Sequence, residues 1–203
     1  RAIDLARQAF ALNLDDTASL RLLTALLSDT NTEASLKEAS SLLDAIQKAS
    51  EKSGNGQAID ADKRVMASVL YRRAVLTPTE HNAADDLQRA AVLLNSLKSS
   101  TEADAVQLAR IVSAQGDKQA ALLALAEQAR RTGAGVPAVR AFAEYWQDNF
   151  ADTSTMKDRY ENALETLENT PGTEIVALDL RLRPANLTSE EVDEIVRQFL
   201  ERV

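Results

Sequence analysis

The feature that most constrains this chain is a spacing of small and apolar residues that recurs in alternate segments. The spacing is four residues and then three, which places its members on one face of a helix. Successive occurrences begin 37, 44, 38 and 35 residues apart. They are Ala2, Ala6, Ala9; Ala39, Leu43, Ile46; Ala83, Leu87, Ala90; Ala121, Leu125, Gln128; and Met156, Tyr160, Ala163. Recurrence at nearly fixed intervals indicates a repeated helical unit.

The segments between these occurrences carry a companion pattern in which a small residue follows a large one. The pattern Ala105, Leu108, Ala109, Val112 returns as Val139, Phe142, Ala143, Trp146, and in 17–28 as Leu20, Leu23, Thr24, Leu27. A small residue lets two helices approach closely, and the larger residues one turn away interdigitate across the gap. The two patterns together predict pairs of packed helices.

The composition favours an all-α protein. Only 4% of the residues are aromatic, the chain holds 6 glycines and 4 prolines, and it is rich in residues that lose little rotamer freedom in a helix. Short breaks such as Thr77-Pro78 and Gly116-Asp117 force neighbouring helices to run antiparallel. We expect helices at 1–12, 17–28, 32–52, 58–76, 79–98, 102–114, 117–132, 137–150, 154–168 and 188–203.

The stretch 173–184 is ambiguous. Val176, Leu178, Leu180 and Leu182 alternate as in a strand, whereas Ile175, Leu178 and Leu182 share a helical face. A helix is favoured, because an isolated strand among helices would have no pairing partner.

The stretch EADAVQLARIVSAQGDKQAALLALAEQARRTG resembles the tetratricopeptide (TPR) repeat family. Its residues Leu108, Ala109, Gly116, Asp117 and Ala121 fall on signature positions of the family. The resemblance covers residues 1–168, with periods near the family's length of about 34 residues. The sequence departs from the family where Ala105 replaces the signature Trp and Gly133 the usual Pro, and the second complete unit is about ten residues too long.

The resemblance implies an α-solenoid of antiparallel helix pairs that forms a right-handed superhelix. Residues 1–168 would hold about four pairs and a leading half-repeat, and 169–203 would form an acidic capping segment that ends in a helix. Because Arg1 falls in the middle of a unit, we expect further helices upstream. The alternative is an irregular helical bundle, in which the spacing is ordinary amphipathicity.

Charge and composition argue against several functional classes. The net charge is −8, with 17 basic and 19 acidic residues in 1–150 and 6 and 12 in 151–203. No broad basic surface is therefore available for nucleic acid. The chain has no cysteine for a disulfide or thiolate site, and no apolar run approaches the roughly 18 residues of a spanning helix. We expect no membrane insertion; the compartment stays open, with the cytoplasm favoured.

The sequence offers no catalytic or cofactor constellation. His81 is the single histidine, and with Asp85 and Asp86 it could bind a metal. Adjacent carboxylates on a helix point about 100° apart, so we expect them instead to favour the positive first turn of a helix. The loop SGNGQ has no Gly-Lys-Ser/Thr and no preceding strand, so it is not a phosphate loop. We expect no enzyme activity, metal or cofactor.

A protein or peptide partner is the expected ligand. In the family's register Ala103, Val106, Arg110 and Ser113 line the concave groove, and Arg72 and Arg73 cluster with Lys63 and Arg64. Tyr145 is expected to be an exposed contact. The alternative to partner binding is that these basic residues lie on a solvated face of the protein. Helices 17–28 and 102–114 lack Lys and Asn, so the family's best-known carboxylate clamp is not expected.

Two functional hypotheses follow. The first is a non-catalytic scaffold that binds a peptide or partner protein on the concave face. The second is a structural spacer or docking module of a larger, possibly enzymatic, protein. The aromatic residues Phe142, Trp146 and Phe150 share one face, which favours packing between units over a ligand cage.

The C-terminal stripe of Val192, Ile195, Val196 and Phe199 needs burial. It either closes the last repeat as a solvating cap, which we favour, or packs on something outside this chain.

Overall fold

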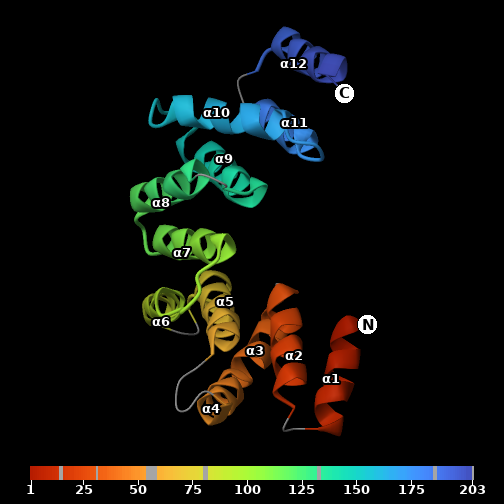
Figure 1. The fold of residues 1–203 in the computed structure, drawn as a ribbon, viewed down its shortest axis with the longest axis vertical. Coiled ribbons are helices and arrows are strands. Elements are labelled where there is room, and N and C mark those ends of the chain that lie inside the picture. Colours follow the sequence, from red (N-terminus) through yellow and green to blue (C-terminus); the bar gives the residue numbers. More distant parts are fainter. Residues whose placement is uncertain are drawn as a thin grey trace. The chain divides into compact units, whose positions relative to one another are not determined.

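The computed structural model describes residues 1–13, 16–30, 32–53, 59–79, 82–131, 134–184 and 187–202. All regular elements in these ranges are α-helices, drawn in Figure 1. The chain divides into two compact units, Arg1–Ser100 and Thr101–Val203. The first unit contains α1 (Ala2–Leu12), α2 (Thr17–Asp29), α3 (Glu33–Ser41), α4 (Leu43–Ser53), α5 (Asp60–Leu76) and α6 (Ala83–Asn95). The second contains α7 (Glu102–Ala114), α8 (Lys118–Arg130), α9 (Val136–Phe150), α10 (Lys157–Glu168), α11 (Glu174–Leu182) and α12 (Ser189–Arg202).

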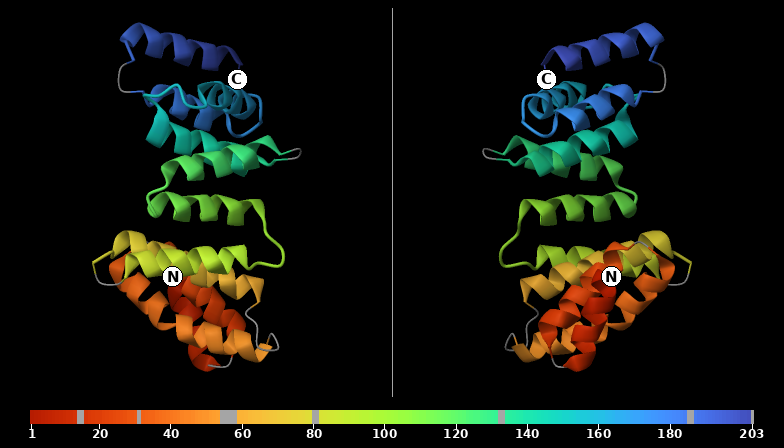
Figure 2. Two further views of the ribbon diagram at one scale, coloured as in Figure 1. Left: turned by 90° about the vertical axis from the view of Figure 1, so that its left-hand side faces the viewer. Right: turned by 90° about the vertical axis from the view of Figure 1, so that its right-hand side faces the viewer.

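Helices that follow one another in the chain pack against each other within each unit. In the second unit this holds for every step from α7 to α12, and α7 also contacts α9 while α9 contacts α11. Figure 2 shows these helices following one another through the second unit. In the first unit α5 packs against α2 and α3 as well as against its neighbours in sequence, α4 and α6. The all-α prediction is confirmed, and this sequential packing is consistent with a helical repeat.

The small residue of the companion pattern is buried in every instance. Thr24, Ala109 and Ala143 are each at most 1% exposed, on α2, α7 and α9. Ala67 on α5 and Ala177 on α11, which also follow a large apolar residue, are fully buried as well. In the second unit the three alanines lie 34 residues apart. A side chain this small lets the helix backbone come close to its neighbours, which is consistent with the burial of these positions.

The ambiguous stretch 173–184 forms the helix α11, as favoured from the sequence. It repeats the companion pattern, with Val176 before the buried Ala177 and Leu180 three residues after it. Ala177 and Leu180 are fully buried against α9 and α10, while Leu178 lies on another side of the helix and is only partly buried. The apparent strand alternation therefore arises because α11 has apolar residues towards α9 and α10 on one side and towards α12 on another.

The continuous helix expected at 32–52 is interrupted at Leu42. The hydroxyl of Ser41 donates to the carbonyl of Glu38 at 2.7 Å, and the N–H of Leu42 donates to Ala39, three residues back, at 3.1 Å. Such side-chain competition with the backbone ladder is a recognised way of ending a helix. The prediction of one helix is therefore wrong, and α3 and α4 take its place.

Two predicted helix starts also lie too early. The helix expected from residue 154 begins at Lys157, because Met156 adopts a left-handed conformation with φ of 57°. The helix expected from residue 79 begins at Ala83, after Asn82 caps it by accepting the N–H of Asp85. Both errors place a residue of the preceding turn inside the helix, which a spacing pattern alone does not prevent.

The Gly-Asp pair between α7 and α8 ends one helix and begins the next. Gly116 has φ of +101°, and its N–H donates to the carbonyl of Ser113 while that of Asp117 donates to Val112. This is the Schellman arrangement, which glycine adopts without steric cost. The carboxylate of Asp117 then accepts the N–H of Ala120 at 2.9 Å and caps α8.

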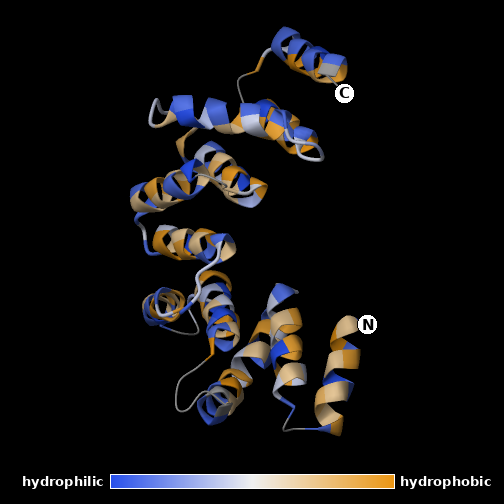
Figure 3. Cartoon of the chain, viewed as in Figure 1, coloured by the Kyte–Doolittle hydropathy of each residue, from blue (hydrophilic) through white to orange (hydrophobic). Residues whose placement is uncertain are grey.

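Each unit has its own apolar core. In the second unit one cluster runs through α7 to α11 and includes Leu125, Phe142, Trp146 and Leu164. In the first unit buried residues gather around Leu27 and Val69 and around Ile46. Figure 3 shows hydrophobic and hydrophilic residues alternating around the helices. The boundary expected after residue 168 would separate the repeats from a capping segment, and it stays a prediction. Helix α11, which follows this boundary, packs on α9 and α10.

Candidate binding surfaces

Arg73 connects α5 to α6 through a buried ion pair. Its Nε lies 2.6 Å from Oδ2 of Asp86 and its Nη2 lies 2.5 Å from Oδ1, so the pair is bidentate. The two side chains are only 16% and 4% exposed. Bidentate geometry is the strongest form of a guanidinium–carboxylate contact. Arg73 therefore has a structural task within the first unit, and its role in partner binding stays a prediction.

Arg72 is bound to the end of α2. Its Nη1 donates to the carbonyl oxygen of Ser28 at 2.6 Å, and its Nη2 lies 2.9 Å from the carboxylate of Asp29. The last carbonyls of a helix lack intrahelical partners and carry partial negative charge, which a cation neutralises. Arg72 thus caps a neighbouring helix as well as facing solvent in part.

The structure brings Ser113 and Tyr145 together. Ser113 lies on α7 and Tyr145 on α9, and the phenol of Tyr145 donates to the hydroxyl of Ser113 at 2.7 Å. Tyr145 is half-buried and packs against the apolar cluster. The expectation that Tyr145 is an exposed contact is therefore only partly met, because its hydroxyl joins two helices.

Val106 and Arg110 lie on the same helix as Ser113. Val106 is partly buried against the apolar cluster. Arg110 is exposed and forms no hydrogen bond or ion pair with any residue that the structure describes. A guanidinium that keeps its donors available is suited to bind a carboxylate of another molecule. Of the predicted contact residues, Arg110 is the one whose polar group is directed to no neighbour within the described chain.

The positions one and two 34-residue intervals after Arg110 lie on α9 and α11. They are Glu144, which accepts from Arg140 at 2.8 Å on the same helix, and Leu178. Likewise, Val106 is followed by Arg140 and Glu174 at this interval. The repeated spacing therefore relates a cationic position on α7 to an acidic one on α9 and an apolar one on α11.

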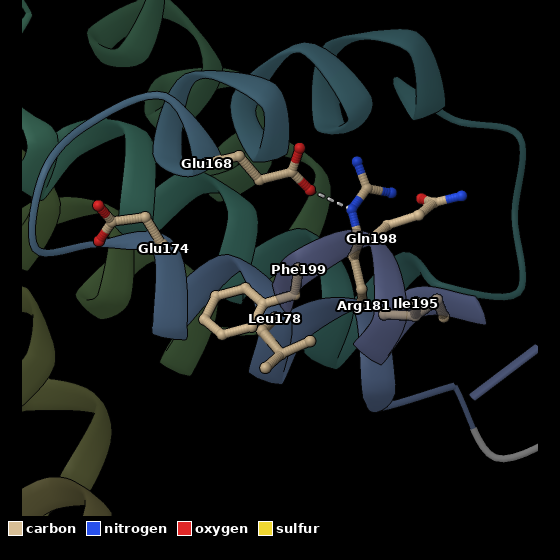
Figure 4. A pocket seen from close by; sticks show the side chains of 7 residues that line it. All are labelled: Glu168, Glu174, Leu178, Arg181, Ile195, Gln198 and Phe199. Atoms are coloured by element: carbon tan, nitrogen blue, oxygen red, sulfur yellow. Dashed lines mark hydrogen bonds and ion pairs between the residues drawn. The ribbon is translucent and has the colours of Figure 1, made fainter. Parts of the chain in front are cut away.

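A pocket of about 330 Å³ lies where α10, α11 and α12 meet, as Figure 4 shows. The sequence patterns do not indicate it. Helix α10 contributes one lining residue and the other two helices three each. They are Glu168, Glu174, Leu178, Arg181, Ile195, Gln198 and Phe199. In Figure 4 Leu178 and the ring of Phe199 are drawn in the lower centre of the view, and Arg181 points towards Glu168.

The pocket depends on how α12 is placed. Its apolar stripe, predicted to need burial, faces α11 but remains only partly buried. Ile195 and Phe199 of this stripe line the pocket. In the sequence, the only signal near this pocket was the apolar stripe itself, which indicated a surface that needs a partner and not a pocket. Its position could not be known without the packing of α12 on α11.

The aromatic residues of α9 and α10 belong to the core. Trp146 and Tyr160 stack with ring centroids 4.1 Å apart and planes at 19°, and both are at most 5% exposed. The phenol of Tyr160 donates to Gln147 at 2.7 Å, and burial raises the pKa of Tyr160 to about 12. The prediction that Phe142, Trp146 and Phe150 serve packing is confirmed, since all three lie in or against the apolar cluster.

No metal cluster is present among the residues that the structure describes. His81, the histidine of the candidate metal set, lies outside them, as do residues 54–57 of the loop SGNGQ and Gly133. Asp86, another member of that set, is paired with Arg73. Within the same described ranges, no helix combines the length and apolar character needed to span a membrane.

Comparison of the chain with protein-family models, with curated protein sequences and with solved structures found no match.

Proposed function

We propose that this chain is a non-catalytic scaffold of TPR-like repeats that binds a peptide or partner protein. The proposed surface is formed by α7, α9 and α11 of the second unit. Its support is the contact of α7 with α9 and of α9 with α11, together with the 34-residue spacing of Ala109, Ala143 and Ala177. Repeats of this kind commonly present such a surface to an extended partner.

The observation that carries the proposal is the environment of Arg110. It is exposed on α7, has no polar partner within the described chain, and lies one turn from Val106 and Ser113. A partly buried apolar side chain, Val106, beside an available guanidinium offers both contact area and a specific charge. The expected partner segment therefore places a carboxylate at this point.

Arg110→Glu tests this surface. We expect the substitution to weaken binding of a partner, isolated by affinity capture and then purified, by at least about tenfold. Thermal stability should remain unchanged, because the side chain is exposed. The matched control is Arg159→Glu, the same charge reversal at an exposed site on α10. Equal effects of the two substitutions on binding would contradict the proposed surface.

A structural role is the second candidate, and the first unit favours it. Arg21, Arg72 and Arg73 are all engaged in contacts between helices of this unit. As a spacer or docking module of a larger protein, the unit would need rigidity rather than a free surface. Arg72→Glu should then lower the melting temperature and leave partner binding intact once the protein is folded, which binding measurements well below the melting temperature can check.

A further inference from the structure

The pocket between α10, α11 and α12 combines an apolar wall with an acidic rim. Leu178, Ile195 and Phe199 form its apolar part, and all three are labelled in Figure 4. All three side chains remain partly exposed. The same helices α11 and α12 also carry Ile175 and Leu200, which are 72% and 69% exposed. This end of the second unit therefore leaves apolar surface uncovered.

The charge around the pocket is negative. Among the described residues that line it, Arg181 is the one cation, and its guanidinium is paired with Glu168 and also lies 3.4 Å from Glu161. Glu174 adds a third carboxylate, which accepts the N–H of Gly172 at 2.7 Å. Residues 151–203 as a whole hold 12 acidic and 6 basic residues. Three carboxylates around one guanidinium attract a cationic ligand and repel an anionic one.

The volume limits the size of the occupant. At about 330 Å³, the space lies at the lower end of the range of about 300–1,000 Å³ for ligand pockets. It suits one or two large side chains. An apolar side chain that enters a pocket while neighbouring charges pair at the rim is a common form of peptide anchoring.

We propose that this pocket binds a large apolar side chain from a basic segment of a partner protein. The aromatic or aliphatic group lies against Leu178, Ile195 and Phe199, and a flanking lysine or arginine pairs with Glu174. The inference rests on the proposed binding function and deepens it. Glu174, Leu178 and Arg181 continue, at the 34-residue interval, the positions of Arg140, Glu144 and Gln147 on α9.

The probe is a synthetic amidated peptide with one phenylalanine between pairs of lysines. It is titrated into the full chain while methyl and aromatic NMR signals of Leu178, Ile195 and Phe199 are followed. We expect saturable shifts at these residues. Replacing phenylalanine by alanine, or every lysine by glutamate, should each weaken binding by at least about tenfold. Raising the ionic strength should weaken binding of the lysine peptide, because its contacts at the rim of the pocket are partly exposed.

Two pairs of variants locate the site on the protein. Gln198→Trp fills the pocket from an exposed position and should abolish the shifts, whereas Gln119→Trp, at an exposed position of α8, should not. Glu174→Lys should weaken binding, whereas Glu190→Lys, an acidic residue in the first turn of α12 outside the pocket, should leave it unchanged. Melting curves of all four variants establish that they are folded.

Two results would overturn the inference: no shifts at the pocket with the lysine peptide, or equal binding of the glutamate peptide. If either occurs while Arg110→Glu still blocks a partner, the pocket assignment fails alone. If the pocket binds the peptide while Arg110→Glu has no effect, the surface around Arg110 is wrong and the pocket assignment stands.

Discussion

The two units hold the same kind of helix pair together with different chemistry. In the first, α5 is joined to α2 by the pair of Arg21 with Asp62 and to α6 by the pair of Arg73 with Asp86. Both aspartates are at most 4% exposed as side chains. In the second, the centre is an apolar and aromatic cluster, and ion pairs such as Arg183 with Asp148 are much more exposed.

The two units therefore differ in what holds their helices in one particular arrangement. A buried ion pair contributes little net stability, because desolvation offsets its Coulombic attraction, but it strongly disfavours any arrangement that leaves one charge alone. The interval from Thr24 to Ala67 is longer than the 34 residues of the second unit, and the additional length includes α4. The ion pairs fix helix positions in the unit where spacing is less regular.

The largest expected effect is in the second unit. Phe142 is 1% exposed, so Phe142→Ala should cost about 3–5 kcal/mol through lost apolar burial and a cavity. Trp146 is the single tryptophan, so the urea midpoint of its fluorescence follows the unfolding of the structure around it in this unit. The control Phe150→Ala, at a partly buried site, should cost distinctly less. Equal costs at the two sites would contradict the role of the cluster as the centre of the unit.

The first unit should respond most to loss of a single charge. Asp86→Ala leaves the guanidinium of Arg73 only 16% exposed and unpaired with its carboxylate, which should cost roughly 2–4 kcal/mol. Far-UV circular dichroism during urea unfolding measures it. Asp85→Ala, an exposed neighbour in the first turn of α6, should cost about 0.5 kcal/mol.

Removing both partners sharpens the comparison. The double variant Arg73→Met with Asp86→Leu should recover most of the stability lost in Asp86→Ala, because no isolated charge remains. If the double variant is as unstable as the single one, the pair is a net source of stability and the two units differ less in how they are held together.

Alkaline pH should affect the second unit through Tyr160. Burial raises its pKa from 10.0 to about 12, so the folded state holds the phenol proton more firmly than the unfolded state does. The stabilisation is complete below pH 10 and is lost as the pH rises through about 12. The free energy of unfolding, measured by Trp146 fluorescence, should therefore fall over this range. For the Tyr160→Phe variant it should fall less steeply. Parallel curves for the two proteins would contradict this assignment.

The smallest effect concerns backbone conformation. Among the described residues, positive φ values occur at Gly116, Met156 and Gly172, all in the second unit. Apart from Gly116 itself and its two chain neighbours, no atom lies within 4 Å of a Cβ added there, so Gly116→Ala should cost only the backbone strain, about 1 kcal/mol. Gly116→Asn should cost less, because asparagine tolerates this conformation better. Urea unfolding followed by Trp146 fluorescence measures both costs. If Gly116→Ala proved more destabilising than Asp86→Ala, backbone strain would outweigh the buried charge.

Much of the fold follows from local patterns in the sequence. The helices, the Gly-Asp turn and the burial of Ala109 and Ala143 could be predicted because each depends on residues within one or two turns. The interruption at Leu42 was missed because it depends on the direction of one hydroxyl, that of Ser41. The pattern on α11 could have been found by extending the 34-residue interval from Ala143 to Ala177.

The candidate site was less accessible from sequence. Arg110 was singled out through the register that the family resemblance implies, but such a register cannot show that Arg72 and Arg73 are held by Asp29 and Asp86. Each of these pairs joins residues on different helices, so its partner depends on how the helices cross. The pocket could not be predicted for the same reason, because its seven lining residues come from three helices.

The sequence by itself determined that this chain forms helices and which small residues each helix buries, because a period of 3.6 residues is a local property of the chain. Only the tertiary structure decided which arginines are paired within the chain and which, like Arg110, keep their donors available. It also decided that α12 leaves a pocket beside α11. Charge pairing and cavity shape depend on distances between helices, and such distances are set by the packing of whole helices and not by the order of residues within one.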